Sequence, residues 1–189
     1  MPNLTVGVLG AGGHIGLVQA AALASLGYST IGYDLDLGRV RDLQKGKLPF
    51  YEPELAGLVQ SGLKSKLLEF TGRVNRLKGI DLAYICTSTP SLPDGRTEIL
   101  QVENAVTAVA RTVQKRVIIV IKSTVPVGTA RRLSLLLQQQ GLSEKAVLVS
   151  NPEFLSEGSA INDFWHPARI VIGSAEPEAA EIVAGIYAP

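Results

Sequence analysis

The sequence predicts a doubly wound α/β fold, in which helices cover both faces of a mostly parallel sheet. Three observations support this prediction: short apolar runs recur along the chain, most of them lack strict polar alternation, and segments with helical spacing separate several of them. The runs expected to be strands are LTVGVL, STIGYD, LLEFT, DLAYICT, RVIIVI, AVLVS and RIVIG. The helical segments include EILQVENAVTAVARTV and TARRLSLLLQQQ.

The composition favours one globular domain over residues 1–189. Hydrophobic residues make up 46% of the 189 positions, enough for a substantial core. The 18 Lys and Arg against 17 Asp and Glu leave a formal charge of +1 without a basic stripe, which argues against nucleic acid or an anionic membrane as a partner. One Cys excludes a disulfide within the chain, and one Cys with two His cannot supply the usual four zinc ligands. We therefore expect a cytoplasmic protein without a metal site.

Residues 1–33 contain no Lys, Arg, Asp or Glu, and such a long uncharged stretch could suggest a membrane segment or a signal peptide. The start MPNLTVG lacks the positive region of a signal peptide. Residues 4–9 are expected to form a strand, residues 10–13 a turn, and residues 14–26 a helix of about 20 Å, too short for a hydrocarbon core of about 30 Å. A buried strand followed by a buried helix explains the missing charge.

The glycine-rich turn VLGAGGHIGL lies between this strand and this helix, where backbone N–H groups can hold a pyrophosphate. Its spacing allows two interpretations, Ala-x-Gly-x-x-Gly from Ala11 or Gly-x-x-Gly-x-x-Gly from Gly10. The second is typical of short-chain dehydrogenases and epimerases, which need a tyrosine four residues before a lysine, and this chain has no such pair. The glycines alone therefore do not decide the function.

Asp34 adds to the evidence of the glycine turn. It ends the second expected strand, 18 residues after Gly16, near the spacing of about 20 at which a carboxylate binds the adenosine ribose of a dinucleotide. Leu35 and Asp36 follow and offer no guanidinium for a 2′-phosphate, so NAD is preferred to NADP. Arg39 could reach the same ribose from the next helix, or could be an ordinary exposed arginine.

Polar residues follow two later strands, at the edge of the sheet where open α/β folds bind ligands. In KSTVPVGT, Ser123 and Thr124 precede Pro126, and either hydroxyl could cap a helix that opens there. In NPEFLSEG, Glu153 and Glu157 are four residues apart, which puts both carboxylates on one face if the segment is helical. Solvated surface acids have the same pattern, so this alternative stays open.

The chain resembles the amino-terminal domain of the UDP-glucose/GDP-mannose dehydrogenase family over essentially its whole length. The blocks that carry the resemblance are, in order, GHIGL, GYDLD, GKLPFYEPEL, TSTP, KSTVPVGT, NPEFLSEG and AINDFWHPARIVIG. The resemblance implies a Rossmann-type NAD-binding domain and a nucleotide-sugar substrate. NPEFLSEG followed by AINDF is most similar to the UDP-glucose branch, since the GDP-mannose branch tends to lack the glycine after the second glutamate.

The resemblance also implies a four-electron oxidation of the sugar C6 alcohol, in which two NAD molecules take hydride, an aldehyde is held as a thiohemiacetal, and a thioester is hydrolysed. Thr124 would order water, Glu153 would serve as acid and base, and Glu157 would lie beside the nicotinamide and the water. Glu153 and the backbone of Phe154 and Leu155 would contact the sugar nucleotide. The expected cofactor-binding residues are Gly10, Gly12, Gly13, His14, Ile15, Gly16, Asp34, Arg39, Thr89 and Glu157.

The chain departs from the family in several places. His14 stands where the family usually has tyrosine and is expected to start a helix rather than to react, and the glycine turn is one residue longer than is common. The family's nucleophilic cysteine and a lysine of its linking helix belong to downstream blocks that do not occur here, so neither Cys86 nor Lys122 is expected to take those roles. We thus expect the linking helix and the carboxy-terminal sugar-nucleotide domain to be absent.

Two functions follow from this resemblance and these departures. In the first, the chain binds NAD and is inactive by itself, as part of a nucleotide-sugar 6-dehydrogenase whose full-length form is a homo-oligomer. In the second, it is a stand-alone NAD-binding or sensor module without catalysis. The first is favoured because a sensor module has no need for both glutamates of NPEFLSEG.

Overall fold

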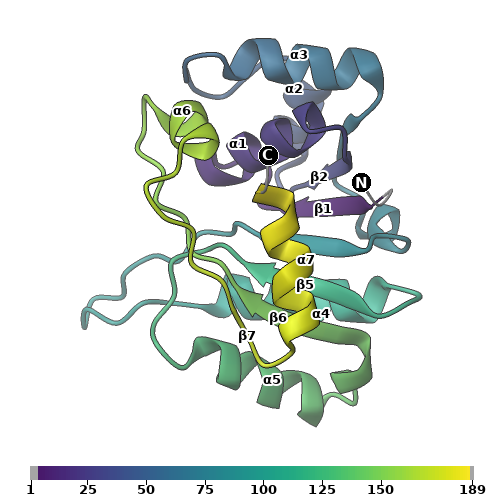
Figure 1. The fold of residues 1–189 in the computed structure, drawn as a ribbon, viewed down its shortest axis with the longest axis vertical. Helices are drawn as coiled ribbons and strands as arrows, with labels where there is room; N and C mark the ends of the chain where they lie inside the picture. The colour runs from purple at the N-terminus through teal and green to yellow at the C-terminus, as the bar shows by residue number, and fades with distance from the viewer. Residues whose placement is uncertain (1–3, 188–189) are drawn as a thin grey trace.

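The computed structural model describes residues 4–187 and contains one seven-stranded sheet in the order β3-β2-β1-β4-β5-β6-β7 (Figure 1). The strands are β1 (Thr5–Leu9), β2 (Ser29–Tyr33), β3 (Leu68–Thr71), β4 (Leu82–Ile85), β5 (Val117–Ile121), β6 (Ala146–Ser150) and β7 (Gly173–Ser174). The first six are parallel, and β7 is antiparallel to β6. Because β1 to β3 extend the sheet in one direction and β4 to β7 in the other, the strand order switches between β1 and β4.

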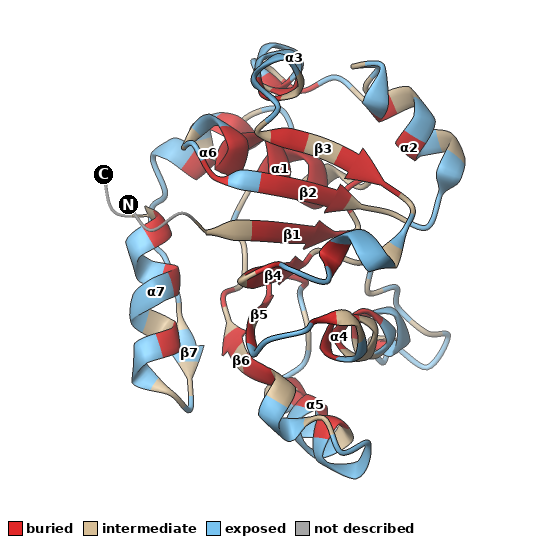
Figure 2. Ribbon diagram, turned by 90° about the vertical axis from the view of Figure 1, so that its right-hand side faces the viewer, coloured by how far each residue is buried: buried red, intermediate tan, exposed pale blue. Residues whose placement is uncertain are grey.

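Helices cover both faces of the sheet, which confirms the predicted fold class. They are α1 (His14–Ser25), α2 (Leu37–Gln44), α3 (Leu55–Ser65), α4 (Leu100–Thr112), α5 (Thr129–Gln139), α6 (Ala160–Trp165) and α7 (Pro177–Tyr187), with 3-10 helices at Val74–Leu77 and Ser143–Lys145. One apolar cluster joins the sheet to α1, α3, α6 and α7, and a second joins it to α4 and α5. Val6 and Val8 of β1 belong to the first cluster and Leu9 to the second. Strands buried on both faces, coloured red in Figure 2, account for the continuous apolar runs.

The charge-free start of the chain forms a buried strand and a buried helix, as predicted. β1 is buried from Val6 to Leu9, and α1 is buried from Gly16 to Ala24. Residues 1–3 of the charge-free stretch lie outside the described range. Within residues 4–187, no helix combines the length and the apolarity needed to span a bilayer.

The strand predicted for RIVIG is wrong for most of its length. β7 contains only Gly173 and Ser174, and it pairs with the end of β6. Ile170 and Val171 are exposed, and the carbonyl of Val171 accepts a hydrogen bond from Asn151 Nδ2 rather than from a neighbouring strand. An irregular apolar segment next to the edge strand of a sheet can thus have the sequence pattern of a strand.

The alternative that Ser123 or Thr124 caps a helix is excluded, because Gly128 is the N-cap of α5. Helix α5 begins only at Thr129, after Gly128 with φ of 90°. Ser123 Oγ instead donates to the carbonyl oxygens of Ile85 (3.2 Å) and Thr87 (2.7 Å), which ties the end of β5 to the end of β4.

The segment 151–158 contains no helical residue, and α6 begins at Ala160. The condition under which Glu153 and Glu157 would share one helical face is therefore not met. Glu153 is half-buried and Glu157 is exposed.

Candidate functional site

The glycine turn lies where the strand order switches, between the ends of β1 and β4. Gly10 follows β1 with φ of 82°, and an added Cβ there would lie 2.6 Å from the carbonyl oxygen of Cys86. The N–H groups of Gly10 and Ala11 both donate to the carbonyl oxygen of Tyr33 at the end of β2, at 3.0 and 3.2 Å. Only glycine fits at position 10, because a side chain would be strained there and would meet β4.

Three glycines of the turn are under close constraint. Gly10 is the first. A Cβ at Gly12 would lie 2.9 Å from Asp34 Oδ2, and a Cβ at Gly16 would lie 2.2 Å from the carbonyl oxygen of Gly10. At Gly13 the nearest atom would be the Gly10 oxygen at 3.4 Å, an ordinary contact. Gly13 belongs to both spacings considered from the sequence. The glycines under close constraint have the spacing Gly-x-Gly-x-x-x-Gly, one residue longer than the common dinucleotide fingerprint.

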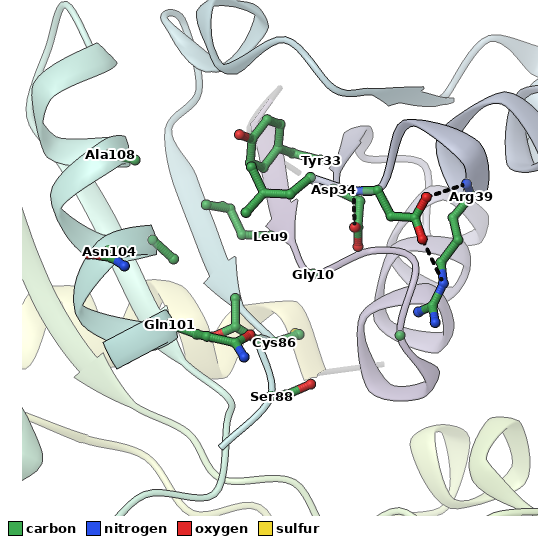
Figure 3. A pocket seen from close by; sticks show the side chains of 15 residues that line it. Leu9, Gly10, Tyr33, Asp34, Arg39, Cys86, Ser88, Gln101, Asn104 and Ala108 are labelled. Atoms are coloured by element: carbon green, nitrogen blue, oxygen red, sulfur yellow. Dashed lines mark hydrogen bonds and ion pairs between the residues drawn. The ribbon is translucent and has the colours of Figure 1, made fainter. Parts of the chain in front are cut away.

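Asp34 and Arg39 hold this turn from the side of β2 and α2 (Figure 3). Asp34 Oδ2 accepts the N–H of Gly12 at 2.7 Å, and Oδ1 accepts the N–H of Asp36 at 2.9 Å. Arg39 Nη1 donates to the carbonyl oxygen of Gly12 at 3.2 Å. Asp36 caps α2, and the N–H of Arg39 is the main cause that lowers the pKa of the Asp36 carboxyl.

Three cavities follow one another along the carboxyl edge of the sheet. The first, of about 490 Å³, extends from Asp34 across the switch point to α4, and Figure 3 shows Gln101 and Asn104 of α4 opposite Asp34. The second, of about 210 Å³, shares wall residues Gly13, Cys86, Thr87 and Ser88 with the first. The third, of about 350 Å³, shares Lys122 and Glu153 with the second.

Most of the residues predicted from the sequence line this row of cavities. The first cavity is lined by Gly10, Gly13, Asp34 and Arg39, the second by Gly13, His14, Ile15, Thr89, Thr124 and Glu153, and the third by Glu153, Phe154 and Leu155. Of the predicted residues, all of which lie in the described range, Gly12, Gly16 and Glu157 line none of the three cavities.

The second and third cavities meet at Glu153. Glu153 Oε2 accepts the N–H of Leu155 at 2.6 Å, which fixes the direction of the carboxylate. Thr124 is exposed at the wall of the second cavity. In the third cavity the guanidinium of Arg169 lies 4.4 Å from the ring centroid of Phe154, a cation–π contact.

Cys86 and Lys122 also line the second cavity. Burial raises the pKa of the Cys86 thiol to about 12, although the Lys122 ammonium lowers it, and Glu153 raises it further. A thiol with this pKa is protonated at neutral pH and is a poor nucleophile. Lys122 is 5% exposed, and its Nζ donates to Asn151 Oδ1 at 3.2 Å and to Tyr187 Oη at 3.1 Å.

The sequence did not indicate a role for Glu52, which is 3% exposed. Its carboxylate accepts hydrogen bonds from His14 Nε2 (2.9 Å) and from the N–H groups of Gly158 (2.8 Å) and Ala160 (2.9 Å). Burial raises the pKa of Glu52, but these hydrogen bonds outweigh it and hold the pKa below its usual value. The one available signal was that Glu52 lies in the family-like block GKLPFYEPEL.

The first cavity has the features that a dinucleotide needs. Backbone N–H groups of the turn lie at the start of α1, and the close approach at Gly12 leaves no room for a side chain between the turn and Asp34. Among the described residues, Thr87 Oγ1 is buried without a hydrogen-bond partner in the wall between the first two cavities. A buried hydroxyl without a partner is a ready contact for a polar ligand.

Comparison with known proteins agrees with this geometry. The model of the NAD-binding domain of the UDP-glucose/GDP-mannose dehydrogenase family matches residues 4–189. A UDP-glucose 6-dehydrogenase of Pseudomonas aeruginosa is 37% identical over 188 residues, which are 96% of this chain and 41% of that protein.

Two solved structures have the same fold over 97% of this chain and 44% of their own. A UDP-glucose dehydrogenase from Pyrobaculum islandicum superposes with a TM-score of 0.90 and 35% identity. A ternary complex of GDP-mannose dehydrogenase from Pseudomonas aeruginosa superposes with a TM-score of 0.91 and 28% identity. The chain thus spans less than half the length of each of these three proteins.

Proposed function

The chain belongs to the UDP-glucose/GDP-mannose dehydrogenase family as an NAD-binding domain, and we propose that it forms one side of the active site of a nucleotide-sugar 6-dehydrogenase. The proposed substrate is UDP-glucose or a related nucleotide sugar. Its C6 alcohol is converted to a carboxylate, one water enters, and each of two NAD molecules accepts one hydride. The observation that carries the proposal is the row of three adjoining cavities from Asp34 to Phe154.

At the first cavity, the proposal assigns the adenosine ribose to Asp34 and Arg39 and the pyrophosphate to the turn from Gly10 to Gly16. Asp34 is already oriented by the N–H groups of Gly12 and Asp36, so its remaining lone pairs are directed without further ordering. Bound NAD supplies the hydride acceptor. Thr89, in the wall of the second cavity, is assigned to the same cofactor.

At the second and third cavities, the proposal assigns proton transfer to Glu153 and the ordering of water to Thr124. Both line the second cavity, and a carboxylate there can take a proton from the sugar alcohol or from water. The backbone of Phe154 and Leu155 is assigned to the sugar nucleotide in the third cavity. Glu157, in the same loop as Glu153, is assigned to a position beside the nicotinamide.

Binding of NADH to the purified chain tests this proposal. We expect NADH fluorescence to report binding, and Asp34→Ala to weaken it about tenfold or more, the effect of losing hydrogen bonds to a charged acceptor. Asp42→Ala is the control, because it removes the same charge from α2, where Asp42 pairs with Lys47 on the surface. Equal affinity of the wild-type chain and the Asp34 variant would remove the ribose assignment.

A further inference from the structure

Glu52 joins segments of the chain that are far apart in sequence. Its three hydrogen-bond donors, His14, Gly158 and Ala160, lie 38, 106 and 108 positions away. His14 is the first residue of α1 and lines the second cavity. Gly158 follows Glu157 directly, and Ala160 is the first residue of α6. One buried carboxylate therefore connects the cofactor side of the site with the loop that carries the two glutamates.

The chemistry of the carboxylate fixes the proton of His14. An ionised carboxylate only accepts hydrogen bonds, and the two backbone N–H groups only donate. His14 Nε2 must then carry a proton to reach Glu52 Oε2 at 2.9 Å. The ring also packs on Phe50, with a centroid distance of 4.9 Å. The start of α1 is thus held to Glu52 in one orientation.

The loop around Glu157 is anchored on both sides of that residue. Before it, the N–H of Ser156 donates to Asp163 Oδ2 at 2.8 Å, and after it, the N–H of Gly158 donates to Glu52 Oε2 at 2.8 Å. Gly158 has φ of 87°, which lets the chain direct its own N–H and that of Ala160 to one carboxylate. The position of Glu157 therefore depends on Glu52, since the segment 151–156 has no regular structure to hold it.

We propose that Glu52 is a positioning residue: it holds the loop of Glu157 against the first turn of α1, so that cofactor bound at the glycine turn also orders the substrate-side loop. The inference rests on the proposed function, because it assumes that NAD binds at that turn. Glu52 touches neither cofactor nor substrate in this account and acts through His14, Gly158 and Ala160.

Amide hydrogen exchange tests the anchoring and the coupling separately. In the ligand-free chain, Glu52→Gln replaces one acceptor oxygen by an NH2 group, so at least one of the three donors loses its partner. Gly158 and Ala160 donate to different oxygens of Glu52, so we expect exchange to accelerate about tenfold or more at whichever of the two amides faces the NH2 group, while β1 and β5 keep their wild-type rates. Glu54→Gln is the control, because Glu54 is an exposed glutamate two residues away whose side chain caps nothing. Unchanged rates at Gly158 and Ala160, or an equal acceleration over the whole sheet, would overturn the proposal.

The coupling is measured by adding NADH. In the wild-type chain we expect NADH to slow exchange at Gly158 and Ala160 as well as at the glycine turn, and in Glu52→Gln at the turn alone. His14→Phe keeps a ring on Phe50 but removes the donor, so the loop amides should stay slow while their response to NADH disappears. No response at Gly158 and Ala160 in the wild type overturns the proposal, whether or not the variants fold. If NADH does not bind the wild type at all, the proposed function fails, and the ligand-free comparison still decides the anchoring.

Discussion

At the scale of single residues, two helical glycines are under opposite constraints. A Cβ at Gly16 of α1 would lie 2.2 Å from the carbonyl oxygen of Gly10, whereas a Cβ at Gly57 of α3 would meet no neighbouring atom within 4 Å. Alanine is preferred to glycine inside helices wherever there is room for its methyl group. The same substitution should therefore change stability in opposite directions at the two positions.

We expect Gly16→Ala to lower the free energy of unfolding by about 1–3 kcal/mol, because the backbone of the turn must move. Gly57→Ala should raise it by about 0.5–1 kcal/mol. Urea unfolding of both variants beside the wild type measures the difference. A Gly16 variant as stable as the wild type would contradict the close contact between α1 and the turn.

The pH dependence of stability should reflect the ionisation of Glu52. Burial raises the pKa of this carboxyl, yet its three hydrogen bonds bring the pKa below the ordinary value of 4.5. A group whose pKa is lower in the folded state contributes stability that is complete above its unfolded value and is lost as the pH falls through its folded value. The difference in unfolding free energy between the wild type and Glu52→Gln should thus be constant near neutral pH and shrink below 4.5. Unfolding curves over the acid range measure it, and a constant difference down to the acid limit would be evidence against an ionised, hydrogen-bonded Glu52.

Asp34 and Glu52 differ in how far sequence could predict them. Asp34 follows a strand at a characteristic distance from a glycine turn, and both features can be recognised within one short stretch of sequence. Every side-chain hydrogen bond of Glu52 joins it to a residue at least 38 positions away, and Glu52 becomes buried only when the chain folds. From the sequence alone, a charged residue between Tyr51 and Pro53 is expected at the surface. In the folded chain the segment that follows β6 packs against it.

At the scale of elements, the sequence correctly predicted the strands whose two faces are both buried. β1, β4 and β5 are buried on both faces, and their apolar runs identified them. The prediction for RIVIG failed because two of its apolar residues are exposed beyond the sheet edge. The capping alternative for Ser123 failed because its hydroxyl donates to carbonyl oxygens at the end of the neighbouring strand, a contact that local sequence does not encode.

The neighbouring hydroxyls of Ser123 and Thr124 should differ in their effect on stability. Ser123→Ala removes the hydrogen bonds of the hydroxyl to the carbonyl oxygens of Ile85 and Thr87, and should lower the free energy of unfolding by about 1 kcal/mol. Thr124 is exposed, so Thr124→Ala should stay within about 0.5 kcal/mol of the wild type. Thermal or urea unfolding of the pair checks this, and the reverse order would be evidence against a stabilising contribution from the Ser123 hydroxyl.

At the scale of the whole molecule, the strand order determines where the site can be. The sequence predicted a doubly wound sheet, and the general rule for such sheets puts ligands at the switch point. The succession of three cavities could not be predicted, because their shared walls come from segments as distant as Gly13 and Glu153.

The chain alone should not turn over substrate, although it should bind NADH. The thiohemiacetal route that the family resemblance implies needs a thiolate, and the single cysteine of the chain, Cys86, has a pKa raised to about 12 by burial. Incubation of the purified chain with UDP-glucose and NAD should leave NADH absorbance at the level of a blank. Steady production of NADH that persists in Cys86→Ala would show a different chemistry, and production lost in that variant would make Cys86 the nucleophile.

The row of three cavities has an exposed apolar side chain in the wall of each outer cavity. Leu35, 82% exposed, lines the first cavity beside Asp34, and the exposed Phe154 lines the third. The proposed reaction uses two cofactor molecules for one sugar, so the first would have to be exchanged for the second while the half-oxidised sugar stays bound. Because the adenosine ribose and the sugar nucleotide are assigned to opposite ends of the row, we expect the cofactor to be replaced beside Asp34 without displacement of the sugar beside Phe154.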